Sequence, residues 1–163
     1  TGIDINPMAI QIMAEALPGR YIVTDVTAPD AVALIDDKYD LIILGEVIEH
    51  LDCFRAALTN LRKLLKEDGE LVITTVNAYC AESILKYVLG YEAVHDEHTC
   101  YFSYSTIKRL LHMNDLALSN FGYHKETRKP ESISSWLGYI FHSVVMAFMP
   151  HFATGIIAHA KPD

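Results

Sequence analysis

The sequence has few cysteines, little basic charge and no long uninterrupted apolar run, and each shortage argues against a class of function. Lysine and arginine together number 13 against 21 acidic residues, which gives a formal net charge of −8 at pH 7. A nucleic-acid partner would require a basic face for the phosphate backbone, so this balance argues against one. The most apolar stretch, residues 133–149, is interrupted by polar side chains. It falls short of the roughly 20 residues that a membrane span needs, so we expect no stable span.

The cysteines are odd in number and widely spaced. Cys53, Cys80 and Cys100 form neither a disulfide framework nor a zinc-binding spacing. The first residues also lack the basic region and apolar run of a secretory signal. We therefore expect a protein of the reducing cytoplasm.

What is present suits a single globular domain with a sizeable core, because 51% of the 163 residues are hydrophobic. Apolar periodicity and turn residues predict strands that alternate with helices, which is typical of an α/β fold with a largely parallel sheet and an antiparallel last strand. The predicted strands cover residues 1–5, 21–26, 39–44, 71–76, 116–123 and 154–160. The predicted helices cover residues 6–17, 29–36, 52–66, 78–89 and 103–113, and a turn is expected at 67–69.

A variable apolar segment is expected at 125–150, with a polar linker over 125–132 and an apolar helix after it. One interpretation of this helix is a cover over a substrate pocket or a lipid-facing surface. The other is ordinary packing on the sheet or a dimer contact. The helix lacks the Lys/Arg face of a membrane-surface helix, which weakens the lipid version.

The segment over residues 39–51 is the most informative part of the chain. Its apolar run predicts a strand that is buried on both faces. The run ends abruptly at Gly45 and is followed by Glu46, Glu49 and His50. Ligands of open parallel sheets bind outside the carboxyl ends of the strands, so these polar residues stand where a ligand would lie.

Three successive predicted strands end in, or next to, a carboxylate, namely Asp4, Asp25 and Glu46. We expect these three side chains along one edge of the sheet. A carboxylate there can accept hydrogen bonds from the vicinal hydroxyls of a ribose. Asp25 could accept from the exocyclic amine of a base while the Val26 N–H meets a ring nitrogen. The alternative is that each aspartate merely caps a following loop or helix.

Several segments together resemble the class I S-adenosylmethionine-dependent methyltransferases. The most specific are Glu-x-x-Glu-His-Leu at 46–51 and Asp-Gly-Glu-Leu-Val-Ile at 68–73. Gly-Ile-Asp-Ile-Asn-Pro at 2–7 supports them, and the resemblance spans most of the chain. It is strongest to the branch that includes ubiquinone-biosynthesis O-methyltransferases and many sugar and natural-product methyltransferases. The implied fold is the Rossmann-like methyltransferase sheet.

The resemblance implies a site for S-adenosylmethionine at the strand ends. Glu49 and His50 would start the next helix at the mouth of the active site. An electronegative rim would also suit the sulfonium cation of this cofactor. The residues that the resemblance assigns to the cofactor, from the ribose through the adenine to the methionine part, are Asp4, Ile5, Asp25, Val26, Gly45 and Glu46.

The chain departs from the family's pattern at its beginning, where the family's first strand and Gly-x-Gly loop do not appear. In the family that strand is central, so here it would lie between the strands over 1–5 and 39–44. Without it the two parts of the sheet lose their shared partner, and each buried backbone group left unpaired costs about 1–3 kcal/mol. We therefore expect a fragment of a longer protein, or a missing N-terminal segment supplied by a partner chain.

Histidines supply the candidate catalytic groups, because the pKa of histidine lies closest to neutrality. An in-line methyl transfer mainly needs alignment and desolvation of the nucleophile, sometimes with the help of a base. The first candidates for a base are His50 and His98, followed by His95 and Tyr101. The alternative for His50 is a residue that orients the start of a helix, and the alternative for His98 is a loop anchor.

Residues 95–100, His-Asp-Glu-His-Thr-Cys, offer nitrogen and sulfur ligands to a metal. Their spacing matches no strong zinc pattern, and the family generally needs no zinc. The sequence therefore predicts no metal site.

The resulting hypothesis is transfer of a methyl group from S-adenosylmethionine to an oxygen or nitrogen of a small-molecule acceptor, with oxygen favoured. One rival is a nucleotide-sugar or NAD-binding oxidoreductase of the same fold class. It would need a glycine-rich loop in the residues before Asp4 and a catalytic Tyr-x-x-x-Lys motif. The other rival is a degenerate methyltransferase-like domain that serves as a scaffold or a homodimer partner.

Overall fold

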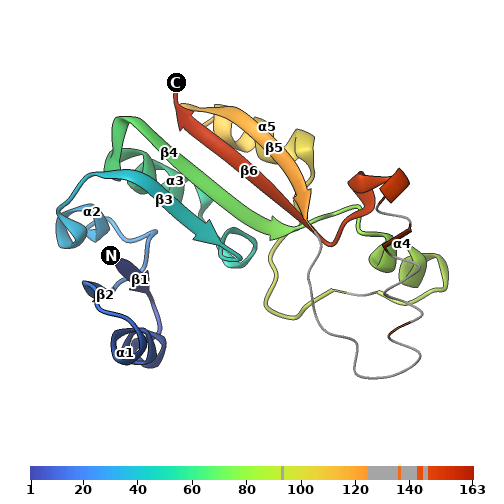
Figure 1. Ribbon diagram of the computed structural model, residues 1–163, viewed down its shortest axis with the longest axis horizontal. Coiled ribbons are helices and arrows are strands. Elements are labelled where there is room, and N and C mark those ends of the chain that lie inside the picture. Colours follow the sequence, from blue (N-terminus) through green and yellow to red (C-terminus); the bar gives the residue numbers. More distant parts are fainter. Residues whose placement is uncertain (93, 125–135, 137–142, 145–146) are drawn as a thin grey trace.

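The computed structural model describes residues 1–92, 94–124, 136, 143–144 and 147–163. Its strands form two separate hydrogen-bonded sheets (Figure 1). The smaller sheet pairs two parallel strands, β1 (Gly2–Asp4) and β2 (Tyr21–Val23). The larger has, in spatial order, β3 (Tyr39–Gly45), β4 (Leu65–Val76), β6 (Gly155–Pro162) and β5 (Leu116–His124).

The N-terminal block consists of β1, β2 and the helix α1 (Pro7–Ala16) that connects them. Asn6 caps this helix as its sequence predicts, because its side-chain oxygen accepts a hydrogen bond from the Met8 N–H at 2.9 Å. Pro7 occupies the first helical turn, where its missing N–H costs nothing. The strand β2 is shorter than predicted, so Asp25 lies two residues beyond its end.

The larger sheet is mixed, and the predicted antiparallel last strand is confirmed. β3 and β4 are parallel, whereas β6 runs antiparallel to both of its neighbours, β4 and β5. The helices α3 (Phe54–Leu64) and α5 (Tyr104–His112) lie behind this sheet in Figure 1. Their apolar side chains and those of the strands form the main core, which includes Leu58, Leu61, Leu71, Ile73, Ile107, Leu111 and Ile156.

The prediction that the strand over 39–44 is buried on both faces is wrong. Leu44 is buried, but Leu41 and Ile43 are 51% and 67% exposed. Their side of β3 borders a cavity, because the β1–β2 sheet stands apart from β3 and does not pair with it. Among the described residues, this strand therefore has a continuous apolar run although only one of its faces is buried.

The predicted turn at 67–69 is also wrong, because these residues belong to β4, which begins as soon as α3 ends. The pairing jumps from Tyr39 opposite Leu65 to Leu41 opposite Glu70, so the intervening residues of β4 form a bulge. Gly69 fits here because an added Cβ would lie 2.8 Å from the Tyr39 carbonyl oxygen. The bulge thus takes the place of the predicted turn between α3 and the strand.

β1 and β3 each have a strand partner on one side only among the described residues. The expectation that no strand of this chain joins the two parts of the sheet stays a prediction. The further expectation, that the chain is a fragment or borrows a segment, stays a prediction.

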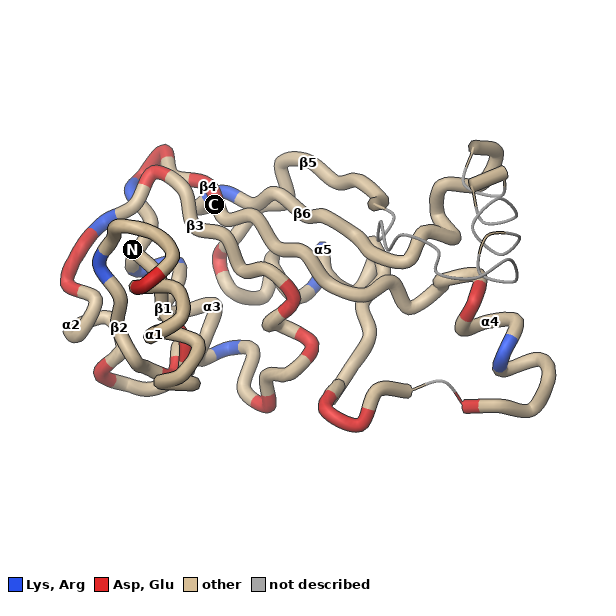
Figure 2. The backbone as a smooth tube through the Cα atoms, turned by 60° about the horizontal axis from the view of Figure 1, so that its bottom comes forward, with Lys and Arg blue, Asp and Glu red and all other residues tan. Residues whose placement is uncertain are grey.

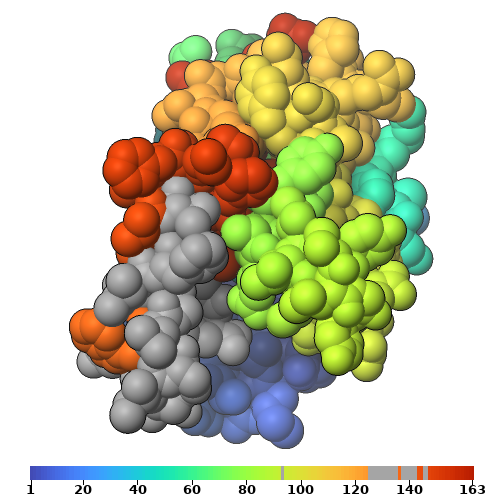
Figure 3. Space-filling model, turned by 90° about the vertical axis from the view of Figure 1, so that its right-hand side faces the viewer, coloured from blue at the N-terminus to red at the C-terminus, as the bar shows by residue number. Residues whose placement is uncertain are grey.

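The remaining elements are short. They are α2 (Ala31–Ile35), α4 (Ala81–Val88) and two 3-10 turns, η1 (Ile48–His50) and η2 (Pro150–Phe152). Figure 3 shows α4 and the loop after it on the surface of the molecule. Most of the predicted linker and apolar helix over 125–150 lies outside the described residues. Among the helices that the structure does describe, none has the length and apolar character to cross a membrane.

Candidate functional site

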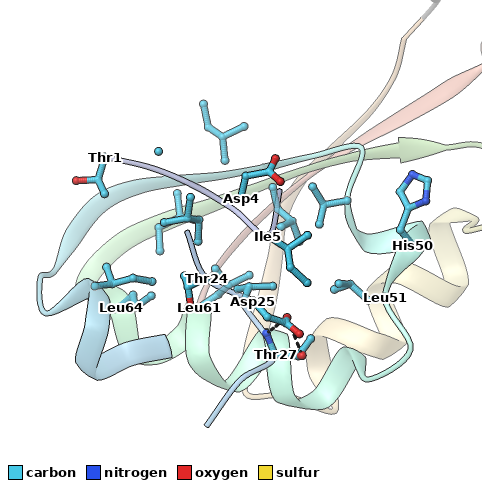
Figure 4. A pocket seen from close by; sticks show the side chains of 18 of the residues that line it. Thr1, Asp4, Ile5, Thr24, Asp25, Thr27, His50, Leu51, Leu61 and Leu64 are labelled. Carbon is cyan, nitrogen blue, oxygen red and sulfur yellow. Dashed lines mark hydrogen bonds between the residues drawn. The ribbon is translucent and has the colours of Figure 1, made fainter. Parts of the chain in front are cut away.

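A cavity of about 790 Å³ opens between the two sheets (Figure 4). Residues 1–5 line one side of it, and Tyr39 and residues 41–44 of β3 line the other. Leu61 and Leu64 of α3 also border it. The cavity therefore combines apolar walls with the polar residues at the strand ends, a composition typical of small-molecule sites.

Asp4, Asp25 and Glu46 all line this cavity, as the positions of the strand ends predict. Asp4 is the last residue of β1, and one oxygen of its carboxylate accepts a hydrogen bond from the Asn6 N–H at 2.7 Å. The second carboxylate oxygen accepts no hydrogen bond from the described residues. Ile5 lies beside Asp4 in Figure 4 and adds an exposed apolar surface.

The loop after β2 holds Asp25 by two local hydrogen bonds. One carboxylate oxygen of Asp25 accepts from both the N–H and the hydroxyl of Thr27, each at 2.8 Å (Figure 4). Val26 follows Asp25 and also lines the cavity. The loop thus brings the Asp25 carboxylate and the Val26 side chain to the same cavity.

Asn60 ties that loop to the other block, and the sequence analysis missed it. Its side-chain amide on α3 donates to the carbonyl oxygens of Val26, at 2.8 Å, and Ala28, at 2.9 Å. Asn60 is only 7% exposed. The signal was present, because an asparagine on the buried side of a helix needs partners for its amide. Asn60 therefore fixes where the Asp25 loop stands relative to the larger sheet.

Glu46 turns the chain at the end of β3 in the left-handed backbone region, with φ of 50°. Its N–H donates to the Thr74 carbonyl at 3.0 Å, which holds this strained conformation in place. Partial burial raises the pKa of the Glu46 carboxyl above its usual value, and the adjacent Glu49 carboxylate raises it further. Gly45, assigned to the cofactor by resemblance, is not among the residues that line the cavity.

Glu49 and His50 lie on η1, directly after this turn. Glu49 is 1% exposed, and the Thr75 hydroxyl donates to its Oε2 at 2.8 Å. His50 is exposed at the edge of the cavity (Figure 4), with its Nδ1 3.1 Å from the Glu97 carbonyl oxygen. The predicted helix start is thus a single 3-10 turn that points one acid inward and one imidazole outward.

The loop over 91–102 brings His98 to His50, with ring centroids 4.7 Å apart. Thr99 anchors this loop, because its N–H and hydroxyl donate to the Glu49 carbonyl at 2.8 and 2.9 Å. His95 stacks on the other side of His98 at 4.7 Å between centroids. Desolvation lowers the pKa of His98, and the neighbouring His50 and His95 lower it further.

The two predicted catalytic histidines are therefore neighbours, although only His50 lines the cavity itself. Tyr101 lies next to His98, with ring centroids 5.5 Å apart. Glu49, His50 and His98 each offer a metal-ligating atom, and these atoms lie within 4.8 Å of one another. The sequence analysis missed Thr99, whose neighbours Glu49 and Leu51 are distant in the chain.

Comparison of the sequence with family models identifies one family. The model of a methyltransferase domain family matches residues 1–119 of this chain. No curated protein matches the sequence.

Solved structures with a similar fold are methyltransferases as well. An S-adenosylmethionine-dependent methyltransferase from Archaeoglobus fulgidus has a TM-score of 0.65 at 16% identity, with 98% of this chain and 74% of that one covered. The putative methyltransferase of Haloferax volcanii, in complex with the activator Trm112, has a TM-score of 0.68 at 12% identity, with 99% and 70% covered. The magnesium protoporphyrin IX methyltransferase of Synechocystis, with bound S-adenosylhomocysteine, has a TM-score of 0.62 at 14% identity, with 99% of this chain and 63% of that one covered. At these identities the likeness is one of fold.

Proposed function

This chain belongs to the class I S-adenosylmethionine-dependent methyltransferases, and on that premise we propose that it methylates an oxygen or nitrogen of a small-molecule acceptor. The observation that carries the proposal is the gathering of Asp4, Asp25 and Glu46 around one cavity. Oxygen is the favoured acceptor atom.

The residues of the cavity fit an adenosine. The free oxygen of Asp4 would accept hydrogen bonds from the ribose hydroxyls, and that of Asp25 would accept from the adenine amine. The side chains of Ile5 and Val26 would cover the faces of the base. The negative rim, which includes Glu46, complements the positive charge that the cofactor carries.

When bound, S-adenosylmethionine supplies an electrophilic methyl group on a positively charged sulfur. The part of this chain is to align the acceptor, to exclude water and to take up a proton. His50 is placed for the last role, because it stands at the edge of the cavity. Its Nδ1 faces the Glu97 carbonyl and so carries the hydrogen, which leaves Nε2 as the basic nitrogen.

Charge supports a small acceptor over a nucleic acid. The net charge is −8, and Figure 2 shows the lysine and arginine positions scattered along the described chain. A polyanionic acceptor would instead need its phosphates neutralised by clustered cations. The same acidic character favours a neutral or cationic small molecule.

Calorimetric titration of the purified chain with S-adenosylmethionine, NAD and a nucleotide sugar tests this proposal. We expect binding of S-adenosylmethionine alone. Replacing Asp4 by alanine removes hydrogen bonds to a charged group worth about 1.5–3 kcal/mol, so the affinity should fall roughly 10- to 150-fold. Asp68→Ala is the matched control, because Asp68 is exposed on β4 and does not line the cavity.

Each rival function has its own result in the same titration. Binding of NAD or a nucleotide sugar in place of S-adenosylmethionine would support the oxidoreductase, and binding of none would support the scaffold. Equal affinities in Asp4→Ala and Asp68→Ala would show that the cofactor lies elsewhere. Mass spectrometry of small-molecule candidates after incubation with the cofactor would then identify the acceptor.

A further inference from the structure

Glu49, His50 and His98 form a compact group of ligating side chains at the end of β3. One ligating atom from each lies within 4.8 Å of the others. From this arrangement we propose that the three residues bind a divalent transition-metal ion. Two imidazoles and one carboxylate suit Mn²⁺, Fe²⁺, Co²⁺ or Zn²⁺ better than Mg²⁺, which prefers oxygen ligands alone. The proposed site requires no bound S-adenosylmethionine and so does not rest on the proposed function.

His98 supplies the first independent sign of a missing ligand. Its Nδ1 is buried and has no hydrogen-bond partner among the described residues. An unsatisfied buried ring nitrogen is costly, and native structures rarely leave one without a reason. A metal ion that takes one ring nitrogen would account for keeping a histidine in this position.

The other two ligands are oriented as metal ligands usually are. A ligating histidine commonly donates its second ring N–H to a backbone carbonyl or carboxylate, and His50 Nδ1 faces the Glu97 carbonyl at 3.1 Å. The Thr75 hydroxyl donates to Oε2 of the Glu49 carboxylate at 2.8 Å and fixes its position. His50 and Glu49 are thus each held in place by a contact with another segment of the chain.

The loop that brings in His98 is attached at the residue next to it. The Thr99 hydroxyl donates to the carbonyl oxygens of Glu49 and Leu51, at 2.9 and 2.8 Å. The Thr99 N–H adds a third bond, also to the Glu49 carbonyl, at 2.8 Å. These bonds join two segments that are about fifty residues apart in the sequence. They hold His98, the neighbour of Thr99, close to Glu49 and His50.

Local charge favours a cation at this point. The Glu46 and Glu49 side chains lie close enough to interact with each other, and Glu49 is almost fully buried. A carboxylate buried as deeply as that of Glu49 is costly unless it is paired, and a divalent ion beside it would supply the opposite charge. Since His50 lines the cavity, the ion would lie at its mouth. With the ion bound, His50 Nε2 is a ligand and takes up no proton, so His50 acts as the base described above only in the metal-free chain.

This proposal replaces the expectation of no metal that the sequence analysis drew from residues 95–100. That expectation tested the spacing within one contiguous segment. The structure takes only His98 from it and draws Glu49 and His50 from η1. The ligand set is therefore discontinuous in the sequence, which spacing rules for a single segment do not detect.

Titration of the untagged, chelator-treated chain with Co²⁺ tests the site, followed by calorimetry and by the visible absorption of protein-bound Co²⁺. We expect one ion per chain. His50→Ala should lower the affinity about tenfold or more, and because His50 is exposed the variant should keep its fold. Glu49→Gln keeps the shape of a buried ligand while it removes the charge, and it should weaken binding similarly.

The control is His112→Ala, since the His112 side chain is exposed on α5 and belongs to no ligand group among the described residues. It should bind Co²⁺ like the parent chain. Absence of Co²⁺ binding, or equal binding by the parent, His50→Ala and Glu49→Gln, would overturn the proposal. The outcome is independent of the S-adenosylmethionine titration, so the two proposals can fail separately.

Discussion

The two blocks of this molecule differ in how they are stabilised. The larger sheet, with α3 and α5, encloses a continuous core of fully buried side chains. In the N-terminal block, no side chain of α1 is buried, and the residues of β1 are only half-buried. Both blocks line the same cavity. The side of the site formed by β3 and α3 therefore rests on a packed core, whereas the side that carries Asp4 depends on contacts across the cavity.

Those contacts are few but specific. Asn60 holds the Asp25 loop from α3, and the Arg20 guanidinium donates to the carbonyl oxygens of Leu34 and Ile35, at 3.1 and 2.7 Å. A ligand in the cavity would add contacts to both sides at once. Binding and stability of the N-terminal block are therefore expected to be linked.

The largest expected effect compares the same substitution in the two blocks. Ile73→Ala in β4 removes a side chain with no exposed surface and should lower the free energy of unfolding by about 2–5 kcal/mol. Ile12→Ala in α1, where the side chain is 62% exposed, should change it by less than about 0.5 kcal/mol. Urea unfolding followed by circular dichroism measures both. A large loss in Ile12→Ala would show that the α1 surface is covered in solution and would break the comparison.

An intermediate effect is expected from the tie between the blocks. Asn60→Ala leaves the buried Val26 carbonyl without its side-chain donor and leaves the Ala28 carbonyl with only the Ala31 N–H, so we expect a loss of about 1–3 kcal/mol in the free energy of unfolding. The affinity for S-adenosylmethionine should fall as well, because the Asp25 loop loses its anchor.

Thr59→Ala is the matched control for that variant, since Thr59 is the exposed neighbour of Asn60 on α3. It should leave both stability and affinity near those of the parent chain. If Asn60→Ala retained full cofactor affinity, the loop would not need the larger sheet to hold its position.

The smallest effect concerns the exposed end of the larger sheet, away from the cavity. The Lys66 ammonium donates to the Asp40 carboxylate at 2.8 Å, and this hydrogen bond and charge hold the pKa of Asp40 below its usual value. Lys66→Met should raise that pKa toward its usual value, measured by NMR titration. Lys63→Met, which leaves the pair intact, should not shift it.

The sign of the pH effect follows from the lowered pKa. The pair adds stability above the ordinary pKa of an aspartate and loses it as the pH falls through the lowered folded value. In Lys66→Met this acid-side loss should disappear, while stability near neutral pH should hardly change because both groups are exposed. A large loss near pH 7 would contradict the surface character of the pair.

Much of the fold could be predicted from local patterns. The Asn6-Pro7 start of α1 and the carboxylates at three strand ends depend on neighbouring residues and on alternation. Their predicted positions agree with the structure. By contrast, the exposed face of β3 and the bulge that replaces the turn at 67–69 depend on what lies beside each strand. Apolar character alone does not contain that information.

The site divides in the same way. The amino-acid sequence by itself determined the order of strands and helices, and so brought Asp4, Asp25 and Glu46 to one cavity, because strand direction and connection length leave little choice. Only the tertiary structure decided that His98 meets Glu49 and His50 and that Asn60 holds the Asp25 loop. These contacts join segments tens of residues apart, and their geometry is set by the packing of loops, which no local periodicity encodes.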